Sequence, residues 1–213
     1  MPKVVFMRHG ESTFNKSDRF SSWIDADLTE KGKEQAKDTA EKLKAFNISR
    51  IFSSSLKRSR NTARIVSQIL ALPKESVSSS EKLNERHYGI LTGLSRSEAR
   101  NRYGVDQVQH WRRSFTGKPP EIPEDLAFMW RIPYDQNFPR SESLEDVSKR
   151  APVYFDEEIR PFVEKGENVL VVSHGAPIRS ILMELKSLSE EEAARIEIAN
   201  AEFIVYDFEI KEK

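Results

Sequence analysis

Two stretches of consecutive apolar residues, far apart in the chain, each lead directly into a histidine and a glycine. Val4–Met7 precede Arg8-His9-Gly10, and Val169–Val172 precede Ser173-His174-Gly175. Four apolar residues in a row leave no polar face for water, so each stretch predicts a buried strand of a parallel sheet. Because the carboxyl ends of parallel strands line one crevice, we expect the two histidines to face each other there.

Each His-Gly pair also has a simpler interpretation, in which the histidine only caps a strand. The match between two strand ends favours a functional site over that interpretation. We expect the glycine after each histidine to let the backbone turn sharply and to let an anion approach the backbone N–H groups.

The remaining sequence alternates strand patterns with helix patterns. We expect further strands at 51–52 and 203–208, and helices over 29–46, between 56 and Pro73, and over 95–103, 106–113, 143–163, 176–185 and from 189 onward. Such alternation is typical of an α/β fold, here a three-layer arrangement with a mostly parallel, twisted sheet between helices.

The length of 213 residues is consistent with a single domain over 1–213. Residues 114–142 stand out because they hold prolines at 119, 120, 123, 133 and 139 among scattered aromatic residues. This segment is too apolar for a solvated tether, so we expect Phe115, Phe128 and Trp130 to pack on the body of the protein. We interpret 114–142 as an insertion or lid.

The composition excludes several classes of function. Lys plus Arg and Asp plus Glu both total 34, so no net positive charge favours nucleic acid or an anionic membrane as a partner. The absence of cysteine excludes disulfides, thiolate metal sites and a cysteine nucleophile. No secretory signal or membrane-spanning run is visible, so we expect a cytoplasmic protein, either a monomer or a homo-oligomer.

Arg58 lies at the expected start of the helix that follows the turn at 53–55. A helix N-terminus favours an anion, and a guanidinium group there adds donors with the geometry of a phosphate. Taken alone, Arg58 is equally consistent with a solvated surface charge.

A family resemblance covers nearly the whole chain in order. Its motifs are Arg8-His9-Gly10-Glu11-Ser12 with Asn15, Ser55-Leu56-Lys57-Arg58 with Thr62-Ala63, Leu83-Asn84-Glu85-Arg86-His87-Tyr88-Gly89, Gly93-Leu94, Gln107-Val108, Trp111-Arg112-Arg113, Pro119-Pro120, Ser141-Glu142-Ser143-Leu144 and Ser173-His174-Gly175. Together they resemble the cofactor-dependent phosphoglycerate mutases of the histidine phosphatase superfamily. Arg-His-Gly alone indicates only the superfamily, which includes many phosphatases, whereas the run 83–89 followed by 111–113 is more specific to the mutases.

The resemblance implies interconversion of 3-phosphoglycerate and 2-phosphoglycerate, a step of glycolysis and gluconeogenesis. It makes His9 the nucleophile that is phosphorylated, primed by 2,3-bisphosphoglycerate as cofactor. Arg8, Arg58, Asn15 and His174 would surround the transferring phosphoryl group, with no metal ion. Glu85 would be the general acid and base.

The same resemblance implies a set of substrate-binding residues besides Asn15. They are Ser21, Ser22, Arg86, His87, Tyr88, Arg96, Arg112, Arg113, Gly175 and Ala176. Arg86, Tyr88, Arg112 and Arg113 would hold the carboxylate and the stationary phosphate of the substrate. Without the family context, the two adjacent arginines would be read as an exposed basic pair.

The sequence departs from the family at several of these positions. Ser22 replaces a glycine, Ala176 an asparagine and Arg96 a lysine, and Asn200-Ala201 replaces a common Thr-Gly pair. Many relatives also continue past the last strand with a tail that closes over the site, whereas this sequence stops at Lys213. We therefore expect segment 114–142 to be the main cover of the site.

Two other functions remain consistent with the sequence. The first is a phosphatase of the same superfamily acting on small phosphorylated metabolites, in which water intercepts the phosphohistidine. The second is a binding module that has kept the fold without catalysis. The presence of Arg8, His9, Arg58, Glu85 and His174 argues against the second.

Overall fold

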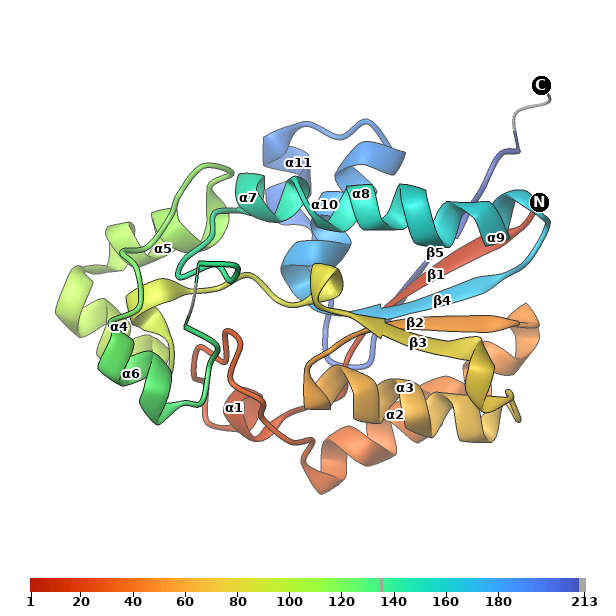
Figure 1. Cartoon of the computed structure of the whole chain (residues 1–213), viewed down its shortest axis with the longest axis horizontal. Helices are drawn as coiled ribbons and strands as arrows, with labels where there is room; N and C mark the ends of the chain where they lie inside the picture. Colours follow the sequence, from red (N-terminus) through yellow and green to blue (C-terminus); the bar gives the residue numbers. More distant parts are fainter. Residues whose placement is uncertain (135, 211–213) are drawn as a thin grey trace.

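A five-stranded sheet forms the centre of the protein (Figure 1). The computed structural model describes residues 1–134 and 136–210; Asp135, within the expected insertion, and the chain end at 211–213 lie outside the described residues. The strands are β1 (Lys3–Arg8), β2 (Arg50–Ser54), β3 (Val77–Ser80), β4 (Val169–Ser173) and β5 (Phe203–Asp207), in the order β3-β2-β4-β1-β5. Only the pairing of β5 with β1 is antiparallel among these strands.

Helices account for most of the remaining described chain. The α-helices are α1 (Thr13–Lys16), α2 (Glu30–Leu43), α3 (Lys57–Ile69), α4 (Arg96–Tyr103), α5 (Val105–Arg113), α6 (Glu124–Met129), α7 (Leu144–Ser148), α8 (Ala151–Tyr154), α9 (Arg160–Glu164), α10 (Gly175–Leu185) and α11 (Glu190–Arg195). Short 3-10 turns are η1 (Lys44–Phe46), η2 (Lys74–Ser76), η3 (Glu81–Leu83) and η4 (Gly89–Leu91), and η5 (Phe155–Ile159) is a π-helix.

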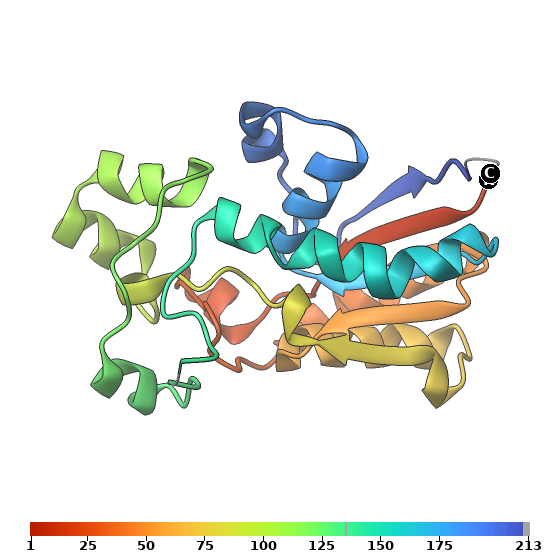
Figure 2. The same ribbon diagram turned by 45° about the horizontal axis from the view of Figure 1, so that its top comes forward.

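The sheet is covered by helices on both faces because successive side chains of its central strands point in opposite directions. Val4 and Phe6 pack in one cluster with residues of α7 to α10, whereas Val5 and Met7 pack in another with residues of α2 and α3. Figures 1 and 2 show these two helical layers on either side of the sheet. The predicted three-layer α/β fold with a mostly parallel sheet is confirmed.

The two central strands place the two histidines side by side. Arg8 at the end of β1 is in register with Ser173 at the end of β4, and the backbone N–H of His9 donates to Ser173 O at 3.1 Å. The imidazole rings of His9 and His174 lie 4.9 Å apart between centroids. The expectation drawn from the two apolar strands is therefore met by the geometry of the sheet.

Gly10 has a different physical role from the one expected. A Cβ atom at Gly10 would lie 2.2 Å from Gly32 O, and one at Gly32 would lie 2.0 Å from Glu11 O. The two glycines therefore allow the loop after β1 to approach the first turn of α2, backbone against backbone. This contact fixes the position of the residue that follows β1.

Some element boundaries differ from the sequence predictions. The expected helix over 143–163 is broken at Lys149 and Arg150, and Pro152 and Pro161, the second residues of α8 and α9, cannot donate a backbone hydrogen bond. Strand β3 was not expected, since Val77-Ser78-Ser79-Ser80 has no apolar alternation. Among the described helices, none combines the length and apolar character needed to cross a membrane.

The segment 114–142 contacts the body of the protein in two places. Residues of its middle part, including Trp130 and Ile132, form a cluster with Trp23 and Ile24, while Phe115 packs against the main core. Phe128 is an exception to the expected packing, because its side chain is 84% exposed on the outer face of α6. The segment is anchored through its other apolar residues.

Candidate active site

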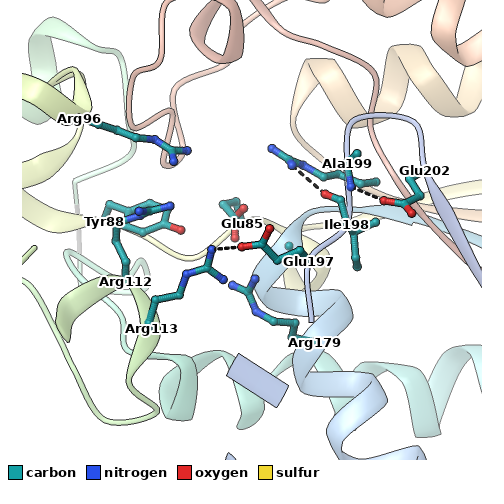
Figure 3. A pocket seen from close by; sticks show the side chains of 12 residues that line it. Glu85, Tyr88, Arg96, Arg112, Arg113, Arg179, Glu197, Ile198, Ala199 and Glu202 are labelled. Carbon is teal, nitrogen blue, oxygen red and sulfur yellow. Dashed lines mark hydrogen bonds and ion pairs between the residues drawn. The ribbon is translucent and has the colours of Figure 1, made fainter. Parts of the chain in front are cut away.

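Two adjoining cavities open at the carboxyl ends of β1 and β4. The smaller, of about 70 Å³, is lined by Arg8, His9, Asn15, Arg19, Phe20, Ser21, Ser22, Arg58, Glu85, Tyr88, Arg96 and Arg112. The larger, of about 440 Å³ (Figure 3), is lined by Arg8, Glu85, Tyr88, Arg96, Arg112, Arg113, Gly175, Arg179, Glu197, Ile198, Ala199 and Glu202. Five lining residues are common to both, so the cavities form one site with a nucleophile end and a wider distal end.

His9 is buried at the nucleophile end and held in one tautomer. Its Nδ1 lies 2.7 Å from Gly10 O, and a carbonyl oxygen can only accept, so Nδ1 carries the proton and Nε2 has the free lone pair. Burial, followed by the positive charges of Arg58 and Arg8, lowers the pKa of His9 well below its ordinary value. His9 is therefore a neutral imidazole with an available nucleophilic nitrogen at neutral pH.

His174 lies beneath His9 and does not line either cavity. Ser54 Oγ accepts from Leu56 N and also forms a hydrogen bond of 2.7 Å with His174 Nε2. The other ring nitrogen, His174 Nδ1, is buried without a partner among the described residues. Ser54 was not singled out from the sequence, although it is the last residue of the buried strand β2.

The site is rich in buried guanidinium groups that face no carboxylate in an ion pair. Within residues 1–134 and 136–210, the ion pairs of arginine do not include Arg8, Arg58, Arg86, Arg112 or Arg179. Arg58 instead donates to the backbone carbonyls of Ile24 and Ser22, each at 2.9 Å, and Arg8 donates to Ile198 O at 2.9 Å. Burial lowers the pKa of both Arg58 and Arg112 to about 10.

An excess of buried positive charge in a protein of zero net charge requires an anion to balance it. Arg58 is the second residue of α3 and is 1% exposed. The alternative reading of Arg58 as a solvated surface charge is wrong for this reason. Its guanidinium is fixed by neutral carbonyl groups, which leaves its charge available to a ligand.

Asn15 is oriented by hydrogen bonds to its amide oxygen. Its Oδ1 accepts from Ser12 N, Ser12 Oγ and Asn200 Nδ2 at 2.9 to 3.2 Å. Because the oxygen is used internally, the amide nitrogen is the group that remains to donate into the cavity. Asn200 replaces a threonine common in the family, and here it also donates to the backbone carbonyl of His9.

Glu85 lines both cavities at the junction of their two ends. Its Oε1 accepts from the backbone N–H groups of Arg86 at 2.9 Å and Ala176 at 3.2 Å. Ala176 is therefore not a cavity-lining residue, but its backbone N–H, in the first turn of α10, helps to hold the carboxylate. The arrangement leaves Oε2 of Glu85 free of hydrogen bonds to the described residues.

A buried ion pair supports the loop that carries Glu85. Arg150 binds both carboxylate oxygens of Glu142 at 2.7 and 2.9 Å and donates to the backbone carbonyls of Lys82, Asn84 and Glu85. Glu142 in turn accepts from His87 N at 2.8 Å. The Ser141–Leu144 motif thus acts as a clamp on loop 82–89, although its residues do not line the site.

Arg112 and Arg113 face different parts of the site, as adjacent residues of a helix do. Arg112 lines both cavities, whereas Arg113 lines only the larger one and binds Glu197. Tyr88 also lines both cavities, and its backbone N–H donates to Ser22 Oγ at 3.0 Å. Arg96 lines both cavities as well and forms an ion pair of 2.9 Å with Asp18.

Besides Ala176, two more of the expected substrate-binding residues, Arg86 and His87, do not line either cavity. Arg86 stacks on the Tyr88 ring, 4.7 Å from its centroid, and donates to Arg112 O at 3.1 Å. His87 is completely buried, and its Nδ1 accepts from Gly89 N at 3.1 Å. Both side chains pack within the loop, and Arg86 Nε, Arg86 Nη1 and His87 Nε2 are buried without a partner among the described residues.

Two departures from the family fall at positions with left-handed backbone. Ser22 has φ of 47° and Ala201 has φ of 60°, in the region that glycine occupies without strain. The backbone therefore keeps at Ser22 the conformation that the family glycine allows. The Ser22 hydroxyl is used internally, by accepting from Tyr88 N.

Sequence reasoning missed several residues that line the site. These are Arg19, Phe20, Arg179, Glu197, Ile198, Ala199 and Glu202. Arg179 had a usable signal, because it lies four residues after Gly175 on the same face of a helix. Residues 196–202 had none, since they form an irregular connection between α11 and β5. Within the described part of 114–142, no residue lines either cavity, and side chains such as Phe115 and Trp130 pack against the core and the Trp23 cluster instead.

The geometry suits transfer of a phosphoryl group through histidine. A neutral, fixed imidazole lies beside buried guanidinium groups that complement the charge on the phosphoryl oxygens. Among the described residues, no group of three His, Cys, Asp or Glu side chains is arranged to hold a metal ion. The fold and site together define a class of α/β enzymes that use a strand-end histidine for phosphoryl transfer.

Comparison with known proteins identifies the family. The sequence profile of the histidine phosphatase superfamily (branch 1) matches residues 4–127 and 119–213. This chain therefore belongs to the histidine phosphatase superfamily. It is 38% identical over 213 residues to a 2,3-bisphosphoglycerate-dependent phosphoglycerate mutase of Corynebacterium diphtheriae, which covers 97% of this chain and 86% of the relative. The identity is 36% over 211 residues to the protein of the same name from Corynebacterium efficiens, covering 96% and 84% respectively.

Solved structures share the fold at lower sequence identity. A protein described as mycobacterial hydrolase 1 has a TM-score of 0.78 at 24% identity, covering 96% of this chain and 88% of that chain. A mycobacterial glucosyl-3-phosphoglycerate phosphatase has a TM-score of 0.77 at 24% identity, covering 96% and 92%. These two likenesses extend to the fold alone.

The buried histidines predict how stability depends on pH. Burial lowers the pKa of His87 to about 4 and lowers the pKa values of His9 and His174 well below 6.5. The unfolded chain therefore binds more protons than the folded one below pH 6.5. Each of these histidines should remove up to about 1.4 kcal/mol of stability per pH unit as the pH falls, with little effect above pH 7.

Urea unfolding between pH 7.5 and 5.5 measures this effect. We expect the midpoint to fall steeply below pH 6.5, and the slope to be shallower in His87→Gln. His110→Gln is the control, since His110 is exposed, and it should keep the slope of the parent protein. A midpoint that stays constant over this range would show that the buried histidines take up protons in the folded state.

Proposed function

We propose that this chain is a 2,3-bisphosphoglycerate-dependent phosphoglycerate mutase, which interconverts 3-phosphoglycerate and 2-phosphoglycerate in glycolysis and gluconeogenesis. The observation that carries the proposal is the neutral His9, fixed by Gly10 O, beside guanidinium groups that have no carboxylate partner. The names of the relatives at 36 to 38% identity support the same activity. The phosphoglycerates are then its small-molecule partners.

The donor set suits the bisphosphate cofactor. A ligand with two phosphates and a carboxylate needs positive charge at both ends of the site, and the arginines are distributed in this way. The buried, unpartnered Nδ1 of His174 and Nε of Arg179 are further groups for a ligand to satisfy. When bound, 2,3-bisphosphoglycerate supplies the phosphoryl group that primes His9.

In the first chemical step, Nε2 of His9 forms a bond to phosphorus as the bond from phosphorus to the departing oxygen breaks. Arg8 and Arg58 stabilise the charge that spreads over the phosphoryl oxygens, and the amide nitrogen of Asn15 and Nδ1 of His174 add hydrogen bonds. The backbone contacts of His9 hold the ring so that the attack is in line. The reverse of this step returns the phosphoryl group to a substrate hydroxyl.

Glu85 is proposed as the general acid and base of both directions. Its Oε2 is the oxygen available to protonate the departing alkoxide and later to take the proton of the attacking hydroxyl. Oε1 is held by two backbone N–H groups, so the carboxylate keeps one orientation during the transfer. Arg150 and Trp23, which both donate to Glu85 O, fix the backbone beneath it.

The distal end is proposed to hold the part of the substrate that does not react. Arg112, Arg113 and Tyr88 supply donors to a carboxylate or a stationary phosphate, and Arg96 borders the same space, whereas Ser21 lines only the smaller cavity. Gly175 lines the larger cavity. Arg86 and His87 support loop 82–89 from inside rather than bind substrate.

The domain organisation, the location in the cell and the role of segment 114–142 are also proposals. We propose that residues 1–213 form one domain and that the enzyme works in the cytoplasm. We also propose that segment 114–142 acts on the site indirectly, by holding the loop around Trp23 and clamping loop 82–89 through Glu142.

An enolase-coupled assay tests the proposed activity. With 3-phosphoglycerate as substrate, we expect formation of 2-phosphoglycerate to depend on added 2,3-bisphosphoglycerate and to disappear in His9→Ala together with the acid-labile phosphoenzyme. His110→Ala, at an exposed histidine, should retain activity. Release of inorganic phosphate faster than 2-phosphoglycerate would instead identify a phosphatase, and phosphate label retained on His9→Ala would exclude His9 as the nucleophile.

The role of Glu85 has its own test. Glu85→Gln keeps the size and the accepting oxygen of the side chain but cannot transfer a proton. We expect turnover to fall by roughly 100- to 10,000-fold while the Michaelis constant changes little. Glu81→Gln, the same charge change at an exposed position nearby, is the control. A large rise in the Michaelis constant with turnover nearly intact would make Glu85 a substrate-positioning residue.

A further inference from the structure

Three consecutive residues of the connection between α11 and β5 each provide an acceptor to an arginine of the site. Ile196 O accepts from Arg179 Nη1 at 3.5 Å, Glu197 Oε1 accepts from Arg113 Nη2 at 2.5 Å, and Ile198 O accepts from Arg8 Nη1 at 2.9 Å. Residues 196–198, here called the strap, therefore accept hydrogen bonds from three of the arginines that line the larger cavity.

The strap is anchored by its apolar members. Ile198 is 6% exposed and belongs to the main core cluster, and Ile196 packs against the same cluster. In contrast, the Glu197 side chain is 76% exposed, although it reaches across the cavity mouth to Arg113 (Figure 3). The backbone of the strap is therefore held by the core, whereas the Glu197 carboxylate is solvent-exposed and paired with Arg113.

Arg179 is the third arginine that donates to the strap. It extends from α10 beside Gly175, where a Cβ atom would lie 3.4 Å from Arg179 Nη1. Its Nε is buried without a partner among the described residues, and its single contact to Ile196 O is long. Figure 3 shows the guanidinium groups of Arg179 and Arg113 pointing into the same space next to Glu197.

We propose that Arg113 and Arg179 form a subsite for the non-reacting anionic group of the substrate, and that Glu197 occupies this subsite until a ligand carboxylate or phosphate displaces it. This inference rests on the proposed function and adds Arg179 as a binding residue and Glu197 as an internal competitor. A carboxylate on Arg113 satisfies the same donors as a ligand anion does, so the two exclude each other. Displacement of Glu197 from Arg113 costs little free energy because an exposed ion pair contributes little to stability.

Glu197 also sets a preference between ligands. A ligand with one anionic group at His9 does not reach Arg113, so it binds with Glu197 in place. A ligand with a second anionic group must displace Glu197, and its affinity is reduced by the lost ion pair. The strap therefore lowers the affinity for phosphoglycerates without affecting a single phosphate-like anion.

Binding to the unphosphorylated enzyme tests the proposal, because no reaction takes place without the primer. Isothermal titration compares 3-phosphoglycerate, which has two anionic groups, with orthovanadate, which has one. We expect Glu197→Gln to bind 3-phosphoglycerate about two- to fivefold more tightly, with the largest effect at low salt, and orthovanadate unchanged. Glu191→Gln is the matched control, since it breaks an exposed ion pair with Arg195 on the neighbouring helix.

Substitutions of Arg179 and Arg113 provide the second part of the test. Arg179→Gln should weaken binding of 3-phosphoglycerate by about tenfold or more and leave orthovanadate within about threefold. In an Arg113→Gln background, the effect of Glu197→Gln should vanish, because the competition takes place at Arg113. Thermal unfolding confirms that each variant is folded, and Arg179→Lys replaces Arg179→Gln if the latter does not fold.

Unchanged or weaker binding of 3-phosphoglycerate by Glu197→Gln would overturn the competitor role of Glu197. Equal losses for both probes in Arg179→Gln would overturn the distal role of Arg179. The proposed function is judged separately, by turnover of the parent protein. The variants could change binding of 3-phosphoglycerate as expected while the parent protein forms no 2-phosphoglycerate. That result would support the subsite and contradict the proposed mutase activity.

Discussion

Burial of guanidinium groups without carboxylate partners is the constraint on which the rest of the site depends. Arg58 is 1% exposed and is held by two carbonyl oxygens of the loop at 22–24, and Arg8 is held by Ile198 O. A carboxylate partner would neutralise these groups and remove their attraction for a phosphoryl group. Neutral carbonyl oxygens fix the guanidiniums in place and keep their charge. Burial lowers the pKa of His9 most, and the charges of Arg58 and Arg8 lower it further, so the groups that bind the anion also help to keep His9 unprotonated.

The sheet explains how such a site is assembled from distant parts of the chain. Parallel pairing of β1 with β4 brings His9 and His174 together, and pairing of β2 with β4 brings Ser54 to His174 Nε2. The loop carrying Glu85 follows the edge strand β3 and is fixed by Arg150 and Glu142. Each reacting group therefore lies at a strand end or on a clamped loop, as in-line transfer requires. The residues with more freedom, such as Glu197, lie at the distal end.

The sequence predicts the centre of this structure well because the centre depends on strong local patterns. The two apolar strands before His9 and His174 indicated the parallel sheet and the position of the crevice, and the family motifs indicated Arg58 and Glu85. A secondary-structure prediction was wrong where an element depends on tertiary contacts and has no local sequence pattern. Strand β3 has no apolar alternation and exists through its pairing with β2. The role of segment 114–142 as a cover stays a prediction; of its described aromatic residues, Trp130, Tyr134 and Phe138 pack in the cluster around Trp23.

The irregular strap at 196–198 has no sequence pattern, and only the fold reveals that it borders the cavity. The environment of the His174 ring also depends on a tertiary contact, with Ser54 Oγ, whereas the His9 ring contacts the carbonyl oxygen of the adjacent Gly10. The position of the phosphoryl group on His9 tests the central claim most directly. We expect phosphoenzyme made with ¹⁵N-labelled histidine and 2,3-bisphosphoglycerate to show one-bond coupling between phosphorus and Nε2 of His9 by NMR. Coupling to Nδ1, or phosphate on another residue, would contradict the account.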